Sequence, residues 1–126
     1  METKNNQPTP PSIREQMKLD LIVAMKAREM IAVSTLRTVL GAIDNAEAVP
    51  VTTPLEYSNG KTNDVPRKQL TSTDIEEILR QELDARQTAA LKYQNLGKEG
   101  EAARLHQEAD VIAHYLGEMQ DVGRNA

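Results

Sequence analysis

Apolar residues recur along most of this chain at spacings of three and four, the pattern of helices that bury one face. The longest such stripe follows Thr71 and Asp74, which form a capping box and predict a helix that begins at Ser72. Its apolar members are Ile75, Ile78, Leu79, Leu83, Ala89, Ala90, Tyr93 and Leu96. Gly97 can take the left-handed conformation that ends a helix, and a second stripe then follows: Ala102, Leu105, Ala109, Ile112 and Leu116. The sequence therefore predicts an antiparallel helical hairpin over 70–116.

An earlier pair of helices is predicted by the same pattern. Ser12 and Glu15 form another capping box, which opens a helix over about 12–28. A second helix is predicted over about 32–48. Because few residues separate the two helices, they form either a tight hairpin or one bent helix. The fold class that follows is all-α: two helical hairpins, or four helices, packed as a small bundle.

Three segments lack a helical pattern. Residues 1–11 hold little to bury and are predicted to be a disordered lead. Residues 49–69 are predicted to be a long flexible linker between the hairpins, with a small hairpin around Asn59 and Gly60 as the alternative. Residues 117–126 show no further amphipathic pattern, so we expect a frayed tail after a single helical domain over 12–116.

The first helix is apolar on more than one side. Leu19, Ile22 and Val23 lie away from its main stripe, which indicates burial on both sides or a second interface. We predict that these three residues form a self-association face. The alternative is that the 49–69 segment or the second hairpin covers them.

A charged pair lies inside the apolar stripe of the second hairpin. Glu82 and Arg86 are four residues apart, the spacing at which helical side chains meet. A partly buried pair must be satisfied by its own members or by a group across the interface. We assign Glu82, Arg86 and Glu108 to one structural polar seam, with the holding of an external ligand as the alternative for the pair.

Composition narrows the classes of partner. The net charge is -4 and the chain has three Tyr with no Phe or Trp, which weighs against DNA and against nonspecific nucleic-acid binding. Lys26, Arg28 and Arg37 cluster near the first interhelical turn and are candidate RNA or partner contacts, although the favoured interpretation is that they stay solvated or ion-paired. With no Cys and no apolar run of membrane-spanning or signal-peptide type, we expect a cytoplasmic protein without membrane partners.

The sequence shows no catalytic machinery. It contains no Gly-rich phosphate loop, nucleophile elbow or carboxylate pair tied to a histidine, so we predict no cofactor and no catalytic residue. His106, Asp110 and His114 recur every four residues, but the outer two lie about 12 Å apart along a helix, too far for one ion to bind all three. We expect a surface row there and no metal site.

A scatter of residues over 12–48 and 70–116 occurs in a fixed order and spacing. They are Asp20, Leu21, Ala24, Met25, Lys26, Ala27, Arg28, Ser34, Thr35, Leu36, Arg37, Ala42, Ile43, Asn45, Glu47, Glu82, Leu83, Arg86, Tyr93, Gly97, Lys98, Ala102, Glu108, Tyr115 and Leu116. In this arrangement the chain resembles the GatB/YqeY family. The resemblance implies an all-helical protein similar to the tail of the B subunit of the tRNA-dependent aspartyl/glutamyl amidotransferase, which helps to hold tRNA while other domains do the chemistry. It also implies a family label of carbon–nitrogen ligase with glutamine as amido-N-donor, inherited from the whole enzyme.

The chain departs from that family pattern in ways that shape the functional hypothesis. Gly117 stands where the family has a Pro before a second, smaller helical domain, so we expect that domain to be lacking and tRNA binding to be weak. The extra apolar residues of the first helix favour an additional interface. We therefore predict a noncatalytic helical module that associates with itself or with a protein partner and is linked to tRNA metabolism. The alternatives are a tRNA-binding accessory of an amidotransferase and an enzyme in its own right.

Overall fold

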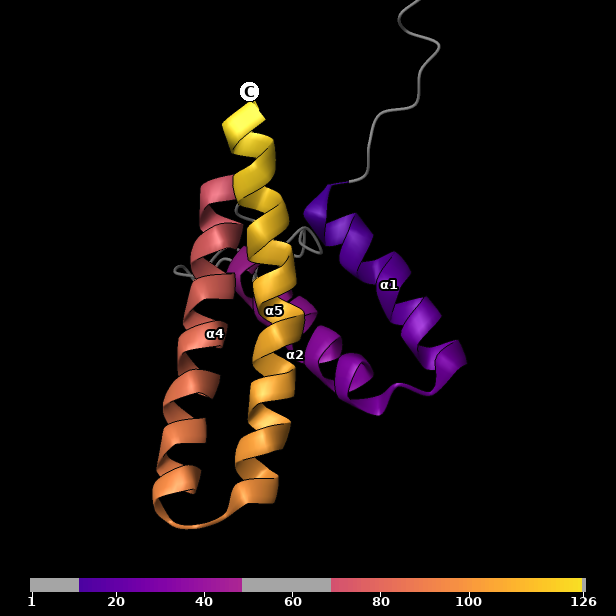
Figure 1. Cartoon of the computed structure of the whole chain (residues 1–126). Helices are drawn as coiled ribbons and strands as arrows, with labels where there is room; N and C mark the ends of the chain where they lie inside the picture. The colour runs from indigo at the N-terminus through magenta and orange to yellow at the C-terminus, as the bar shows by residue number, and fades with distance from the viewer. Residues whose placement is uncertain (1–11, 49–68, 126) are drawn as a thin grey trace, which may run out of the picture.

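The computed structural model describes residues 12–48 and 69–125, with side chains described as far as Gln120. Over these residues the elements are four helices: α1 (Ile13–Ala27), α2 (Met30–Glu47), α4 (Ser72–Asn95) and α5 (Glu99–Asn125). The predicted all-α fold of two packed helical hairpins is confirmed (Figure 1). The lead predicted for 1–11 and almost all of the linker predicted for 49–69 lie outside the described residues. None of the described helices has both the length and the apolar character needed to cross a membrane.

Both predicted capping boxes are present and fix where two of the helices begin. The Ser12 hydroxyl accepts a hydrogen bond from the Glu15 N–H, and the Glu15 carboxylate accepts one from the Ser12 N–H, each at 3.2 Å. Thr71 and Asp74 repeat this reciprocal arrangement before α4, at 3.1 and 3.0 Å. These bonds satisfy N–H groups that the first turn of a helix leaves without partners. The helix predicted to begin at Ser72 does so.

A two-residue turn joins α1 to α2 and decides between the two arrangements left open by the sequence. Arg28 has φ 60° and ψ 36°, the left-handed conformation, and its N–H bonds the Met25 carbonyl. The Glu29 N–H bonds the Ala24 carbonyl at 2.9 Å. These two bonds cap the end of α1, so the chain reverses there. α1 and α2 therefore form a tight hairpin and not one bent helix.

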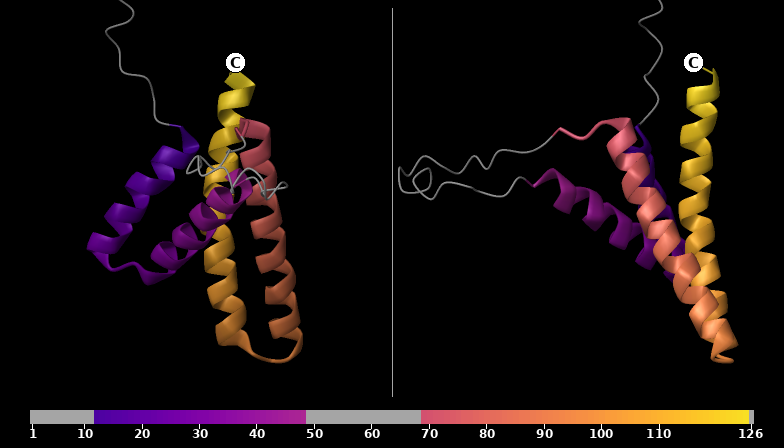
Figure 2. Two further views of the ribbon diagram at one scale, coloured as in Figure 1. Left: turned by 180° about the vertical axis from the view of Figure 1, so that it is seen from behind. Right: turned by 90° about the vertical axis from the view of Figure 1, so that its left-hand side faces the viewer.

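α4 and α5 lie side by side as an antiparallel hairpin, as the two views of Figure 2 show. Gly97 makes the turn with φ +76°, a conformation in which an L side chain is strained. Apolar side chains of both helices are buried along the seam between them: Leu79, Ala90, Ala102, Ala109, Ile112 and Leu116.

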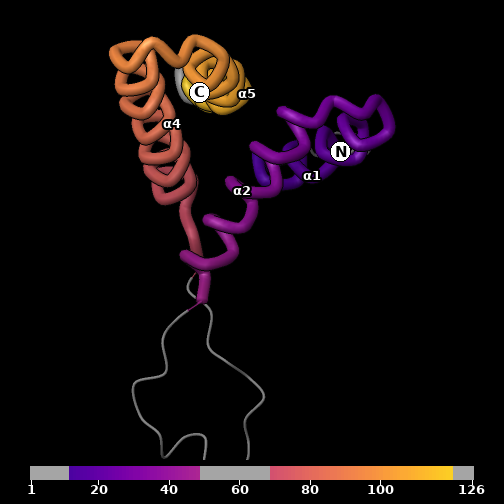
Figure 3. Tube along the Cα trace, turned by 90° about the horizontal axis from the view of Figure 1, so that it is seen from below, coloured from indigo at the N-terminus to yellow at the C-terminus, as the bar shows by residue number. Residues whose placement is uncertain are grey.

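α2 lies between α1 and the α4–α5 hairpin, as the view from below shows most clearly (Figure 3). It buries residues spaced three and four apart, which face the hairpin and α1: Val33, Leu36, Val39 and Ile43. All four helices contribute to one buried cluster: Met17, Leu36, Val39, Ile43, Leu79, Ile112, Tyr115 and Leu116. α1 contributes Met17, which is fully buried.

The prediction that the last helix ends at Leu116 is wrong, because α5 continues to Asn125 and the residues 117–125 are not a frayed tail. Met119 packs against the buried cluster three residues beyond Leu116, so the apolar seam of α5 runs for a further turn. The sequence pattern predicts an end at Gly117. An isolated glycine costs a helix only about 1 kcal/mol relative to alanine, which packing of the next turn can offset.

Replacing Gly97 or Gly117 by alanine should change stability in opposite directions. The positive φ at Gly97 strains an alanine, so Gly97→Ala should lower the free energy of unfolding by about 1 kcal/mol. At Gly117 the added methyl group meets nothing within 4 Å and the backbone is helical, so Gly117→Ala should raise it by about 0.5–1 kcal/mol. Urea denaturation measures both values. A neutral Gly117→Ala would contradict a stable helix beyond Leu116.

Candidate functional site

Three apolar side chains of α1 are exposed together, and we call them the outer face of α1. Leu19, Ile22 and Val23 are 52%, 50% and 64% exposed. At 100° per residue they lie on the side of the helix opposite the fully buried Met17. Large apolar side chains that gather on a surface mark interaction sites more often than isolated ones do. Among the described residues, the outer face of α1 is thus left exposed. The sequence predicts self-association through this same face.

Two methionines extend this apolar surface toward the α1–α2 turn, and neither is among the site residues predicted from the sequence. Met25 and Met30 are both exposed. A guanidinium nitrogen of Arg37 lies 3.9 Å from the Met25 sulfur, so the cationic group contacts the thioether. Both methionines fall outside the stripes that face the core, which is the signal that could have found them. Unbranched, polarizable methionine adapts to irregular partner surfaces.

Ion pairs hold the start of α1 to the end of α2. Arg14 donates to the carboxylate of Glu47 at 2.5 and 2.9 Å and also to Asp44. The hydrogen bond to Glu47, more than that to Asp44, raises the pKa of Arg14 against the opposing effect of burial. The guanidinium is therefore charged at every accessible pH and ties the open end of the α1–α2 hairpin.

A hydrogen bond ties the middle of α1 to α5. The hydroxyl of the buried Tyr115 donates to the carboxylate of Asp20 at 2.5 Å, and the same carboxylate accepts a bond from Gln16 at 2.9 Å. Burial, together with the bond to Asp20, raises the pKa of Tyr115 well above the ordinary tyrosine range. The hydroxyl thus stays protonated as a donor, and α1 is held at a fixed distance from α5.

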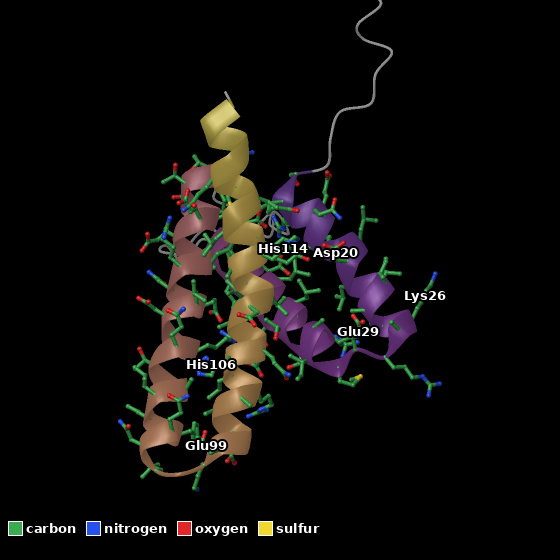
Figure 4. All side chains as sticks on the ribbon, viewed as in Figure 1. Asp20, Lys26, Glu29, Glu99, His106 and His114 are labelled. Carbon is green, nitrogen blue, oxygen red and sulfur yellow. The ribbon has the colours of Figure 1, made fainter. Side chains whose placement is uncertain are left out.

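A groove of about 320 Å³ lies beside this bond, between α1, α2 and α5. Its lining is mostly apolar, with three polar groups that Figure 4 labels around it, Asp20, Glu29 and His114. The remaining lining residues are Val23, Ala24, Ala32, Leu36, Val111 and Tyr115. Val23 belongs to both the groove and the outer face of α1. The arrangement suits the seating of a side chain from a protein partner.

Arg86 joins α4 to α5 through two carboxylates. Its Nη1 donates to the Glu82 carboxylate at 2.8 Å, and its Nε donates to Glu108 at 3.0 Å. Arg86, Glu82 and Glu108 are only 13%, 25% and 12% exposed. The structure thus brings the three residues of the predicted polar seam into contact. Arg86 Nη1 also donates to the Glu82 carbonyl at 3.1 Å. The guanidinium therefore makes its hydrogen bonds to groups of the same chain.

The basic candidates and the histidine row lie on the surface. Lys26, Arg28 and Arg37 are exposed around the α1–α2 turn, and Lys26 points away from α5 in Figure 4. His106 lies 3.4 Å from Gln94 and His114 lies 3.2 Å from Glu118, so each histidine has a neighbour of its own. Within the part of the chain that the structure describes, no three His, Cys, Asp or Glu side chains are grouped as a metal site would need.

Comparison with known proteins gives one match. Over residues 14–122 the sequence matches the family model described as Yqey-like protein. The matched range contains the outer face of α1, the groove and the polar seam. No curated protein and no solved structure matches the chain significantly.

Arg86→Ala should lower the free energy of unfolding by about 1–3 kcal/mol, because it leaves two partly buried carboxylates without their cation. Arg80→Ala is the matched control, since Arg80 pairs with Glu76 at the same i, i+4 spacing on the same helix but at the surface. That variant should cost less than about 1 kcal/mol. Urea denaturation compares the two, and equal costs would mean that the seam is no more buried than the surface pair.

Proposed function

The chain belongs to the Yqey-like protein family, and we propose that this member is a noncatalytic helical protein-interaction module that acts in the cytoplasm. Its binding surface is the outer face of α1, and its partner is a second copy of the same chain. The observation that carries the proposal is the exposure of Leu19, Ile22 and Val23 on a helix whose other side is already packed in the core.

The energetics of the outer face fit a modest dimer. A homodimer buries these three side chains on each copy, and since each is already about half covered, the six together contribute about 5–10 kcal/mol before the cost of association is subtracted. The lost translational and rotational freedom offsets much of that gain. The face therefore supports reversible association and not an obligate assembly.

The polar groups that join the helices favour a structural over a catalytic role. Arg14, Arg86 and Tyr115 each bond a carboxylate of the same chain, and each bond joins two helices. Groups committed in this way position helices and offer little to a reacting substrate. Among the described residues, the outer face of α1 and the adjoining groove stay open to a partner.

Charge favours a protein partner over RNA. The chain has net charge -4, and the basic cluster of Lys26, Arg28 and Arg37 shares its corner with the exposed Glu29 and with Met25. Strong phosphate binding requires a more continuous basic surface. Under this proposal any link to tRNA metabolism runs through protein contacts, and Lys26 serves the protein interface.

Self-association should be lost when the outer face becomes charged. The unmodified chain should show a concentration-dependent dimer by sedimentation equilibrium up to about 100 μM, where even a weak complex is populated. The double substitution Leu19→Glu, Val23→Lys should give a folded monomer, because both residues are exposed in the single chain. Circular dichroism checks that the helix content is retained.

Leu91→Glu, Leu96→Lys is the matched control, since both leucines are exposed apolar residues of the second hairpin, far from α1 in sequence. It should dimerise as the unmodified chain does. A monomeric unmodified chain would contradict the proposal. Unfolding of the α1 double variant would instead place Leu19 and Val23 in the core.

A further inference from the structure

The outer face of α1 carries a symmetric pattern of four residues. Glu15, Leu19, Ile22 and Lys26 follow one another at spacings of four, three and four, and all four are exposed. At 100° per residue they form one narrow stripe opposite Met17. Such a stripe is the seam along which two helices pack. The two central residues of the stripe are apolar and the two end residues are charged, so the pattern is the same in both chain directions. The charges at the two ends have opposite sign.

From this pattern we infer that two copies of the chain pair through antiparallel α1 helices, with Glu15 of each copy against Lys26 of the other. The inference rests on the proposed function and specifies its geometry. A two-fold axis passing between Asp20 and Leu21 places Leu19 against Ile22 of the second copy. The same axis places Glu15 against Lys26, because both pairs of residue numbers have the same midpoint. One interface then repeats each contact twice, as two-fold symmetry requires.

The charges select the antiparallel orientation. In a parallel pair Glu15 would face Glu15 and Lys26 would face Lys26, and both contacts would repel. In the antiparallel pair both contacts attract. Lys26 is exposed, and the Glu15 carboxylate, although it accepts a bond from the Ser12 N–H, keeps further lone pairs for an ammonium group.

The position of α1 in the fold leaves room for a second copy. α1 packs on α2 at one edge of the described helices (Figures 1 and 3), and the side chains of its outer face are exposed. Lys26 extends outward from the end of α1 in Figure 4. Val23 flanks the seam and reaches the groove, so a second copy would also cover part of that groove.

An interface made by one helix from each copy is small. It lies at the low end of the sizes seen in specific complexes, which corresponds to reversible binding. We expect a dissociation constant of about 10–100 μM for the homodimer, a range typical of small transient interfaces. Since the charged contacts are repeated by symmetry, a single substitution alters two of them at once.

The test exchanges the charges. Glu15→Lys alone and Lys26→Glu alone should each weaken the homodimer by about 10-fold or more, since each turns two attractive contacts into repulsive ones. An equimolar mixture of the two single variants should associate within about 3-fold of the unmodified chain, because both contacts are then between opposite charges. The double variant Glu15→Lys, Lys26→Glu should recover likewise. Sedimentation equilibrium measures all of these constants.

Matched controls separate a specific contact from a general charge effect. Glu101→Lys makes the same change in the first turn of α5, and Lys92→Glu makes it in the last turn of α4. Neither should change the dissociation constant by more than about 2-fold. Recovery in the mixture also shows that Glu15→Lys has not unfolded α1 by removing the Glu15 part of its cap.

The outcomes distinguish failure of the antiparallel register from failure of self-association. If the unmodified chain dimerises but the charge variants associate as it does, or the mixture fails to recover, the antiparallel register is overturned. Self-association through α1 then stands only if the Leu19→Glu, Val23→Lys variant is monomeric. If the unmodified chain stays monomeric at about 500 μM, well above the expected constant, the proposed function fails and the register fails with it.

Discussion

The buried stripe of α2 determines how the other three described helices pack, since α2 contacts all of them. α2 contacts α1 on one side and the α4–α5 hairpin on the other, and its residues Val33, Leu36, Val39 and Ile43 lie at the centre of the core. α1 packs mainly through the side that holds Met17 and Ala24, both buried. A helix that is apolar on two sides but packed on one leaves the second side for a partner.

Polar contacts fix the position of α1 relative to the other helices. Arg14 holds its start to the end of α2, and the Tyr115 hydroxyl holds its middle through Asp20. The Arg86 seam fixes the hairpin against which α2 packs. Because these contacts order the helix before any partner arrives, association has less conformational entropy to offset. The same bonds that hold the fold together thus prepare the proposed interface.

The features that could be predicted from the sequence are those set by neighbours along the chain. The caps at Ser12 and Thr71 depend on side chains three residues apart, and the Gly97 turn depends on one residue that tolerates a positive φ. The position of Leu19, Ile22 and Val23 on the side of α1 away from the buried Met17 follows from the same periodicity. The features that were missed depend on tertiary contacts. Met119 packs against the core one turn beyond Leu116, and no local pattern shows that Tyr115 meets Asp20 across 95 residues.

Under the proposed function, a second copy of the chain covers the outer face of α1 in solution. The most direct measurement is amide hydrogen exchange at protein concentrations about tenfold below and tenfold above the expected dissociation constant, because binding protects a region in proportion to its occupancy. Exchange over α1 (Ile13–Ala27) should slow as the concentration rises, while exchange over α4 (Ser72–Asn95) should stay the same. Exchange over α1 that does not change with concentration, in a chain that remains helical, would contradict the account.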